Sequence, residues 1–197
     1  MKIETLTEIE TIKLLDHLLT GFANEEKRTK VIRNYTMTLL MLDAGLRVGE
    51  VGQLLVSDLI YNSIPVTSII IRAEISKTHR DRQIPLSQRL SQSLKNMFTY
   101  IWSKNSYSPY NYAFAMTKKY CQPSSRQIQR IIKRAAMQSI GRPIHPHMLR
   151  HTFATRLMRI TNIRVVQELL GHKNLSSTQV YTHPNSDDLS EAIKHLC

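Results

Sequence analysis

The segment from Ile144 to His183 carries the side chains best suited to chemistry. His147 stands three residues before Arg150, His172 follows a glycine, and Tyr181 comes nine residues after His172. On a helix, residues three apart share a face, so His147 and Arg150 can point at one target. Because a guanidinium attracts negative charge, we expect that target to be an anion.

These four residues suit phosphoryl transfer. A tyrosine hydroxyl can attack phosphorus, and a guanidinium can hold two non-bridging oxygens at once. An imidazole can move a proton or donate a hydrogen bond to the crowded phosphorane. This chemistry needs no cage of soft metal ligands, so we expect no metal ion and no other cofactor.

Four short motifs resemble those of tyrosine recombinases, the integrase family of site-specific DNA recombinases. HPHMLRHTFAT and LLGHKNLSSTQVYTH resemble the end of the family's catalytic domain, with its His-x-x-Arg, its Gly-His and its nucleophilic tyrosine before Thr-His. Upstream, LDAGLRVGEV resembles the first-arginine motif, and SKTHRDRQIPL resembles the hairpin that carries the family's lysine. By this resemblance Glu50 is a supporting residue, and six residues are catalytic: Arg47, Lys77, His147, Arg150, His172 and Tyr181.

The resemblance implies an enzyme that cleaves and rejoins DNA strands at specific sites. In the implied mechanism Tyr181 attacks the scissile phosphate, displaces the 5′ oxygen and forms a covalent 3′-phosphotyrosyl intermediate. His147 is the candidate base, while Arg47 and Arg150 neutralise the phosphorane. His172 donates a hydrogen bond to it. Because the intermediate keeps the energy of the diester bond, the mechanism implies neither ATP nor a metal.

The composition is that of a basic globular chain. Of 197 residues 42% are hydrophobic, and 27 Lys and Arg against 15 Asp and Glu give a formal net charge of +12. Such an excess attracts polyanions and predicts salt-sensitive binding to a phosphate backbone. No apolar run approaches the roughly 18 residues of a membrane-spanning helix, so we expect no membrane partner.

The cysteines and the N-terminal segment indicate where the protein works. Cys121 and Cys197 form no framework of pairs and predict free thiols in a reducing compartment. The first residues, MKIETLTEIETIKLL, carry acidic side chains among the apolar ones and lack the features of a signal peptide. We therefore expect a cytoplasmic, nucleoid-associated protein.

The hydrophobic pattern predicts an α+β fold that is mostly α-helical with a small antiparallel sheet, which the resemblance identifies as the tyrosine recombinase catalytic core. Thr7 and Glu10 match a capping box ahead of the first helix. β-branched segments predict strands at 66–72 and 82–86, and 112–116 is a candidate third strand. Apolar residues at helical spacing predict helices at 7–19, 31–42, 48–55, 88–102, 126–139, 147–160, 162–170, 175–181 and 187–196.

Two basic segments are predicted to contact DNA. The link between the two strands holds Lys77, which the resemblance directs toward DNA as the general acid for the leaving 5′ oxygen. Arg80 and Arg82 are competing basic positions nearby. The helix at 126–139 has a basic face, and the family places a helix here in the major groove. Its basic residues are Arg126, Arg130, Lys133 and Arg134.

Two other functions are compatible with parts of the sequence. VVQELLGHKNLSSTQVYTH also scans as two short helices around a turn, as in a non-catalytic helix-turn-helix DNA-binding regulator, which would give Arg47 and Lys77 no role. A zinc site is suggested by clustered histidines, although HMLRH lacks the glutamate of the HExxH motif. Those histidines are His145, His147, His151, His172 and His183.

We expect a single domain over residues 1–197, because no repeat, low-complexity tract or linker divides the chain. The resemblance covers nearly all of it as a catalytic domain, without the N-terminal core-binding domain that many members carry. It implies double-stranded DNA as partner, a monomer in solution, four protomers in the synapse on DNA, and room for an accessory DNA-binding protein. The final helix, 187–196, would dock on a neighbouring protomer or on its own domain.

Overall fold

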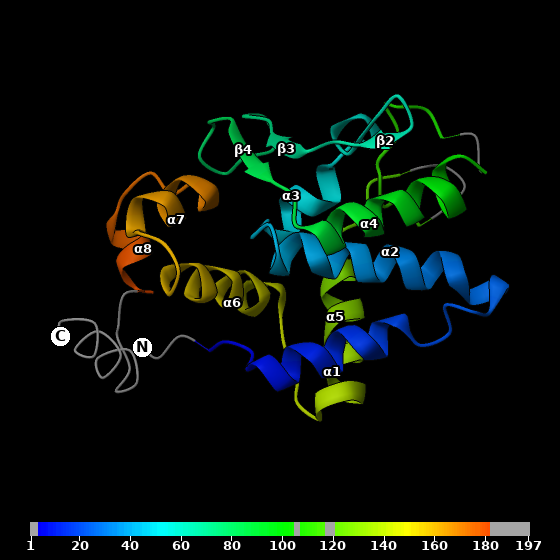
Figure 1. Ribbon diagram of the computed structural model, residues 1–197, viewed down its shortest axis with the longest axis horizontal. Coiled ribbons are helices and arrows are strands. Elements are labelled where there is room, and N and C mark those ends of the chain that lie inside the picture. The colour runs from blue at the N-terminus through cyan, green and yellow to red at the C-terminus, as the bar shows by residue number, and fades with distance from the viewer. Residues whose placement is uncertain (1–3, 105–106, 117–120, 182–197) are drawn as a thin grey trace.

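The computed structural model describes residues 4–104, 107–116 and 121–181. Figure 1 shows the strands along one edge, α1 along the opposite edge, and α7 and α8 together at one end. This is the predicted mostly helical fold with small antiparallel sheets. The helices are α1 (Glu8–Leu19), α2 (Glu25–Leu42), α3 (Val48–Gln53), α4 (Gln88–Met97), α5 (Ser125–Ile140), α6 (Pro146–Met158), α7 (Ile163–Leu170) and α8 (Ser176–Gln179), with short helical turns η1 (Val56–Asp58) and η2 (Phe98–Trp102).

Helix α2 is the centre of the core, in contact with α1, α3, α4, α5 and α6. Its C-terminal turns are buried on every side, since Leu39, Leu40, Met41 and Leu42 all have almost no exposed surface. The helix begins six residues earlier than predicted, because Asn24 caps it by accepting a hydrogen bond from the Lys27 N–H. Residues 25–30 are charged or polar, so apolar residues do not recur there at helical spacing. The hydrophobic pattern therefore did not predict the first turns of α2.

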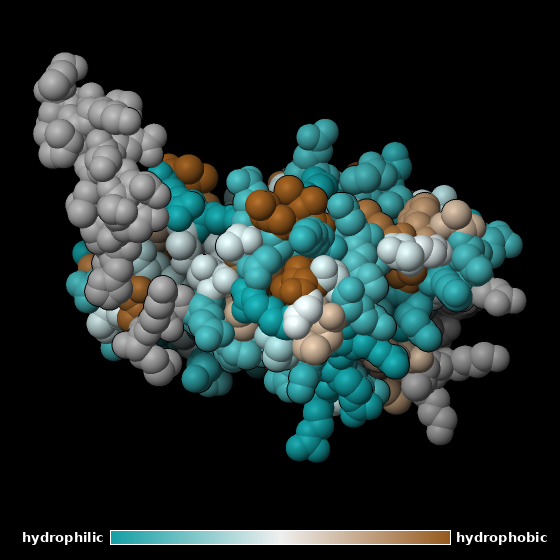
Figure 2. Space-filling model, turned by 90° about the horizontal axis from the view of Figure 1, so that it is seen from below, coloured by the Kyte–Doolittle hydropathy of each residue, from teal (hydrophilic) through white to brown (hydrophobic). Residues whose placement is uncertain are grey.

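Helix α1 begins where the capping box predicted. The Thr7 hydroxyl accepts from the Glu10 N–H at 3.1 Å, and the Glu10 carboxylate accepts from the Thr7 N–H at 2.9 Å. Leu14, Leu15 and Leu18 face the core, whereas Ile9 is 67% exposed. Figure 2, which views this side of the molecule, shows separate hydrophobic areas on a mostly hydrophilic surface.

The predicted sheet is present as β3 (Ser68–Ile71) and β4 (Arg82–Pro85), which pair antiparallel with Ile71 opposite Arg82. A second hairpin, β1 (Ile60–Tyr61) and β2 (Ile64–Pro65), was not predicted. Its two turn residues have positive φ, as a tight hairpin requires, but they are Asn and Ser rather than the Asn-Gly that signals such turns. Among residues 107–116, the candidate third strand forms only a bridge between Leu55 and Tyr112.

Helices α6, α7 and α8 place a second, smaller apolar cluster against the core. It consists of Phe153, Ala154, Val166 and Leu170, with the Tyr181 ring packed on its side. Ile160 was predicted to lie in the helix at 147–160, but α6 ends at Met158 and Ile160 is 81% exposed. The predicted helix at 187–196 lies outside the described residues.

Candidate active site

Arg150 is the cation around which the site is built. It is 4% exposed and lies in the second turn of α6. Its guanidinium donates hydrogen bonds to the carbonyl oxygens of Gly45 and Leu170, the latter at 2.7 Å. Burial lowers the pKa of Arg150 to about 9, so the side chain remains positively charged at neutral pH. One arginine therefore joins the end of α2, the end of α7 and α6 around a fixed positive charge.

Arg47 enters the site because α2 stops abruptly before it. Gly45 has a φ of +62°, and the Leu46 N–H bonds back to the Leu40 carbonyl at 3.1 Å; α2 ends at Leu42, the predicted last residue. A Cβ at position 45 would lie 2.4 Å from the Phe153 ring, so only glycine fits. Arg47 is the N-cap residue of α3 and lies beside the buried carboxylate of Glu50.

Glu50 holds two arginines with one carboxylate. Arg82 donates to both Glu50 oxygens, at 3.0 and 2.6 Å, and Arg47 donates from its side chain at 3.0 Å and from its backbone N–H at 2.8 Å. Although burial alone would raise the pKa of Glu50, the hydrogen bonds and charge of Arg82 lower it below its usual value. The ionised carboxylate therefore fixes Arg47 in place.

Arg82 differs from its prediction as a DNA contact. It is 4% exposed, and its Nε donates to the Leu169 carbonyl at 3.1 Å while both terminal nitrogens bind Glu50. The side chain is thus enclosed by the protein, with each of its three nitrogens held by a protein acceptor, and is not placed to reach a DNA phosphate. Gly171 leaves it room, because a Cβ there would lie 2.9 Å from the Arg82 side chain. Side chains alternate between buried and exposed along β4, and Arg82 takes a buried position. In the sequence Arg82 stands in a basic segment, which gives no sign that this one arginine is buried.

His172 lies between Arg150 and α8 as a neutral ring. Its Nε2 is 3.3 Å from Arg150, which can only donate, so Nε2 accepts and the Nδ1–H donates to the Thr178 hydroxyl at 2.9 Å. Burial, followed by the charges of Arg150 and Arg47, lowers the pKa of His172 to about 4. In this tautomer Nε2 receives a hydrogen bond, whereas the expected role has His172 donating one to the substrate.

Tyr181 lies half-buried just after α8, and its hydroxyl is 2.7 Å from Nδ1 of His151. Burial raises the pKa of Tyr181, against the opposing charges of Arg150 and Arg47. The phenol is therefore protonated at neutral pH. Sequence reasoning gave His151 only a place in the rejected zinc site. Its spacing of four from His147, one helical turn along α6, was the available signal.

His147, the candidate base, is exposed at the start of α6, with its ring centroid 6.3 Å from that of His151. Burial of part of the ring lowers the pKa of His147, and the charges of Arg150, Arg47 and Lys77 act in the same direction. Within the described ranges, no hydrogen bond joins His147 to Tyr181. His147 thus lies beside the cations rather than on the phenol.

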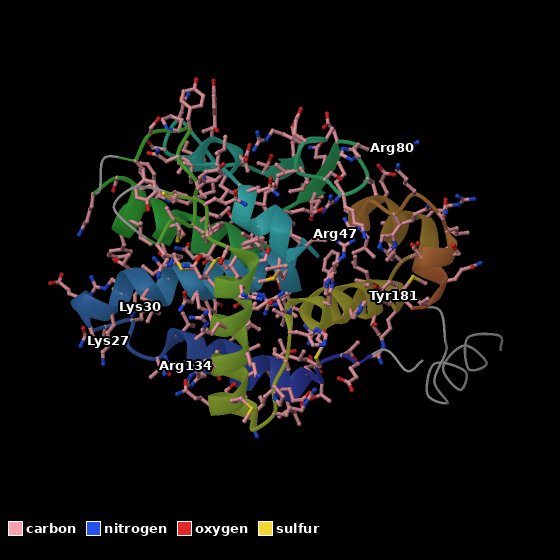
Figure 3. All side chains as sticks on the ribbon, turned by 180° about the vertical axis from the view of Figure 1, so that it is seen from behind. Lys27, Lys30, Arg47, Arg80, Arg134 and Tyr181 are labelled. Atoms are coloured by element: carbon pink, nitrogen blue, oxygen red, sulfur yellow. The ribbon has the colours of Figure 1, made fainter. Side chains whose placement is uncertain are left out.

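The remaining basic candidates are exposed. Lys77 and Arg80 lie on the link between β3 and β4, and Figure 3 shows Arg80 extending from the molecule. Arg47 and Tyr181 lie toward that same end in Figure 3. Helix α5 packs against α3, where Gly52 lies beside Ile128. All four of its cations are exposed: Arg126, Arg130, Lys133 and Arg134.

The positive charges of Arg150 and Arg47 act on the Tyr181 hydroxyl, and such an arrangement can bind an anion beside it. Among the described residues, no group of three or more His, Cys, Asp or Glu is arranged to hold a metal ion. No helix in the same ranges is long and apolar enough to cross a membrane.

Comparisons with known proteins agree with this description. The phage integrase family model matches residues 4–187. A tyrosine recombinase of Pseudothermotoga lettingae is 40% identical over 166 residues, covering 83% of this chain and 54% of that protein. A crystal structure of XerA recombinase matches with a TM-score of 0.72 and 27% identity, over 97% of this chain and 62% of that one. The structure of XerH site-specific recombinase bound to difH substrate, a pre-cleavage complex, matches with a TM-score of 0.74 and 25% identity. The match covers 98% of this chain and 54% of that one.

The chain belongs to the phage integrase family. It spans about half to three fifths of the length of the curated relatives it matches, 54% of one tyrosine recombinase and 61% of another. The family predicted from the four motifs is thus confirmed.

Proposed function

We propose that the chain cleaves and rejoins double-stranded DNA at specific sites through a 3′-phosphotyrosyl intermediate on Tyr181. The observation that carries the proposal is the convergence of Arg47 and Arg150, each fixed by buried partners, on the side of the molecule where Tyr181 presents its hydroxyl. Fixed guanidiniums stabilise the charge that develops on a phosphorane without reorganising. The XerH relative, by its description, binds a difH substrate, which supports a nucleic-acid ligand.

In the proposed reaction the Tyr181 oxygen attacks the scissile phosphorus and the 5′ oxygen leaves. Arg47 and Arg150 bind the non-bridging oxygens, and Lys77 protonates the leaving oxygen from the exposed link. A 5′-hydroxyl then attacks the phosphotyrosine and releases the phenol. The diester bond energy stays in the covalent intermediate, so the scheme uses no ATP and no metal.

Exposed cations on α5 and on the β3–β4 link would hold the DNA backbone around the cleavage site. We place four protomers on DNA in the synapse, from a monomer in solution, and the site of action at the nucleoid. A helix-turn-helix regulator remains the alternative, but it leaves the buried Glu50 bridge between Arg47 and Arg82 without a purpose.

The test is a covalent trap. The chain is incubated with a pool of nicked duplexes made from the DNA of the organism that encodes it, and SDS-resistant adducts are isolated and sequenced. We expect the wild type to form an adduct and Tyr181→Phe to form none, because the variant lacks the attacking oxygen. An equal adduct from both proteins would remove Tyr181 as nucleophile. DNA binding by wild type with no adduct on any duplex would favour the regulator.

A further inference from the structure

The Tyr181 hydroxyl already has a base beside it, and that base is His151. The 2.7 Å separation between Oη and Nδ1 is the only hydrogen bond of this hydroxyl within the described ranges, and the two ring centroids are 5.6 Å apart. His151 is fixed by its place inside α6, one residue after Arg150. Two adjacent residues of α6 thus serve the site: Arg150 is the proposed phosphate-binding arginine, and His151 holds the hydroxyl of the proposed nucleophile, Tyr181.

The direction of this hydrogen bond follows from the protonation of both groups. Burial raises the pKa of Tyr181, so the phenol keeps its proton at neutral pH. Burial lowers the pKa of His151, and the neighbouring His147, Arg150 and His145 lower it further, so the imidazole is neutral. With both groups neutral, the phenol donates to Nδ1 when the ring proton is on Nε2, and this tautomer is the one that leaves Nδ1 able to take the Tyr181 proton.

We propose that Nδ1 of His151 accepts the Tyr181 proton during strand cleavage. As the bond from Oη to phosphorus forms, the proton moves from Oη to Nδ1, and the bond from phosphorus to the 5′ oxygen breaks, with that oxygen protonated by Lys77 or water. Rejoining reverses the transfer: the imidazolium returns the proton to the departing phenol oxygen. This inference rests on the phosphotyrosyl chemistry proposed above and replaces His147 as the base.

The charges around His151 fit this role. An imidazolium beside Arg150 is unfavourable in the free protein, as the lowered pKa of His151 reflects, so the base stays available. The phosphorane brings negative charge into the same space, which makes protonation of His151 easier at the moment of attack. The groups that face it are His147, His145 and Arg150 from α6, with His172 and Tyr181 from the C-terminal segment.

The experiment measures single-turnover adduct formation on a nicked duplex recovered by the covalent trap, for wild type, His151→Ala and His151→Asn. The asparagine can still accept a hydrogen bond from the phenol but cannot hold its proton. We expect both variants to be slower by about 100-fold or more, the usual contribution of a general base. Added imidazole should restore part of the rate of His151→Ala. Full activity of His151→Asn would reduce His151 to a positioning residue and overturn the proposal.

Two controls separate this role from others. On a duplex with sulfur in place of the leaving 5′ oxygen, which needs no acid, Lys77→Ala should recover its rate and His151→Ala should not. His17→Ala removes an imidazole on α1, away from the pair, and should match wild type at saturating duplex. Below the pKa of His151 the wild-type rate should fall as the base becomes protonated, and His151→Ala should lose that inflection. Wild type without any adduct would instead contradict the phosphotyrosyl chemistry itself.

Discussion

Two groups of cations in this molecule are held in opposite ways. In the candidate active site, Arg82 and Arg150 are buried, and hydrogen bonds to a carboxylate, to carbonyls and to a histidine hold their guanidiniums in place. At the far end of α2, a groove of about 470 Å³ lies between α1, α2 and α5, and its lining, as far as the structure describes it, includes cations and no acidic residue. Figure 3 labels three of them, away from Arg47 and Tyr181. The four are Lys27, Lys30, Arg33 and Arg134.

Arg33 makes the contrast sharpest. Burial lowers its pKa, yet its best hydrogen bond is a 3.4 Å contact from its side chain to the Ala115 carbonyl, and its Nε has no partner. The site arginines are fixed before any substrate arrives, whereas the groove supplies positive potential without fixed geometry. Stabilising the charge on one phosphorus atom requires cations in fixed positions. Attracting a long polyanion requires only a positive potential, which cations without fixed positions can supply.

Replacing an arginine by methionine in the site should have the largest effect. Arg82→Met leaves Glu50 buried with one partner fewer, and breaking a buried ion pair in this way costs about 3 kcal/mol of unfolding free energy. Urea denaturation measures it, and adduct formation should fall as Arg47 loses its fixed support. Equal stability of variant and wild type would mean that the bridge contributes nothing.

Two variants, one in the candidate site and one on α5, should separate an effect on the rate of adduct formation from an effect on DNA affinity. Arg150→Ala should lower the adduct rate by about 100-fold, the scale for losing one stabilising donor, with little change in DNA affinity. Arg130→Ala, on the exposed face of α5, should weaken DNA binding several-fold and reduce the salt slope by about one, with an unchanged rate at saturating DNA. Gel-shift titrations at several salt concentrations measure affinity. Parallel losses in both assays for Arg150→Ala would count against its catalytic role.

The smallest effect should have the opposite sign. Arg33→Met removes a partly buried charge without a carboxylate partner, and we expect the unfolding free energy to rise by about 1 kcal/mol or less. Lys13→Met, an exposed lysine on α1 outside the groove, is the matched control and should change stability negligibly. A loss of stability in Arg33→Met as large as in Arg82→Met would erase the distinction between the two regions.

The sequence predicted what local patterns encode. The capping box at Thr7, the end of the second helix at Leu42 and the antiparallel pair β3–β4 follow from residues close together in the chain, and all three are present. The family motifs located the residues that surround the site. The start of α2 escaped because a single capping asparagine decides it.

Other features depend on contacts across the fold. Arg82 is buried because Glu50, 32 residues away, lies opposite it, and no pattern around Arg82 records that partner. His151 meets Tyr181 only because α8 folds back on α6, 30 residues later. Charge and spacing alone could not show that Arg82 is buried while Arg80 is exposed, or that His151 meets the Tyr181 hydroxyl.

Gly171 is a position, away from the reacting atoms, where a substitution should inactivate the protein. Its φ is +63°, and the space where a methyl group would go is filled by Arg82, which holds Glu50 and, through it, Arg47. An alanine at this position should inactivate the protein through three successive displacements without touching DNA. Genetic screens for inactive mutants will therefore recover position 171 alongside the reacting residues, although it is inert in the reaction itself.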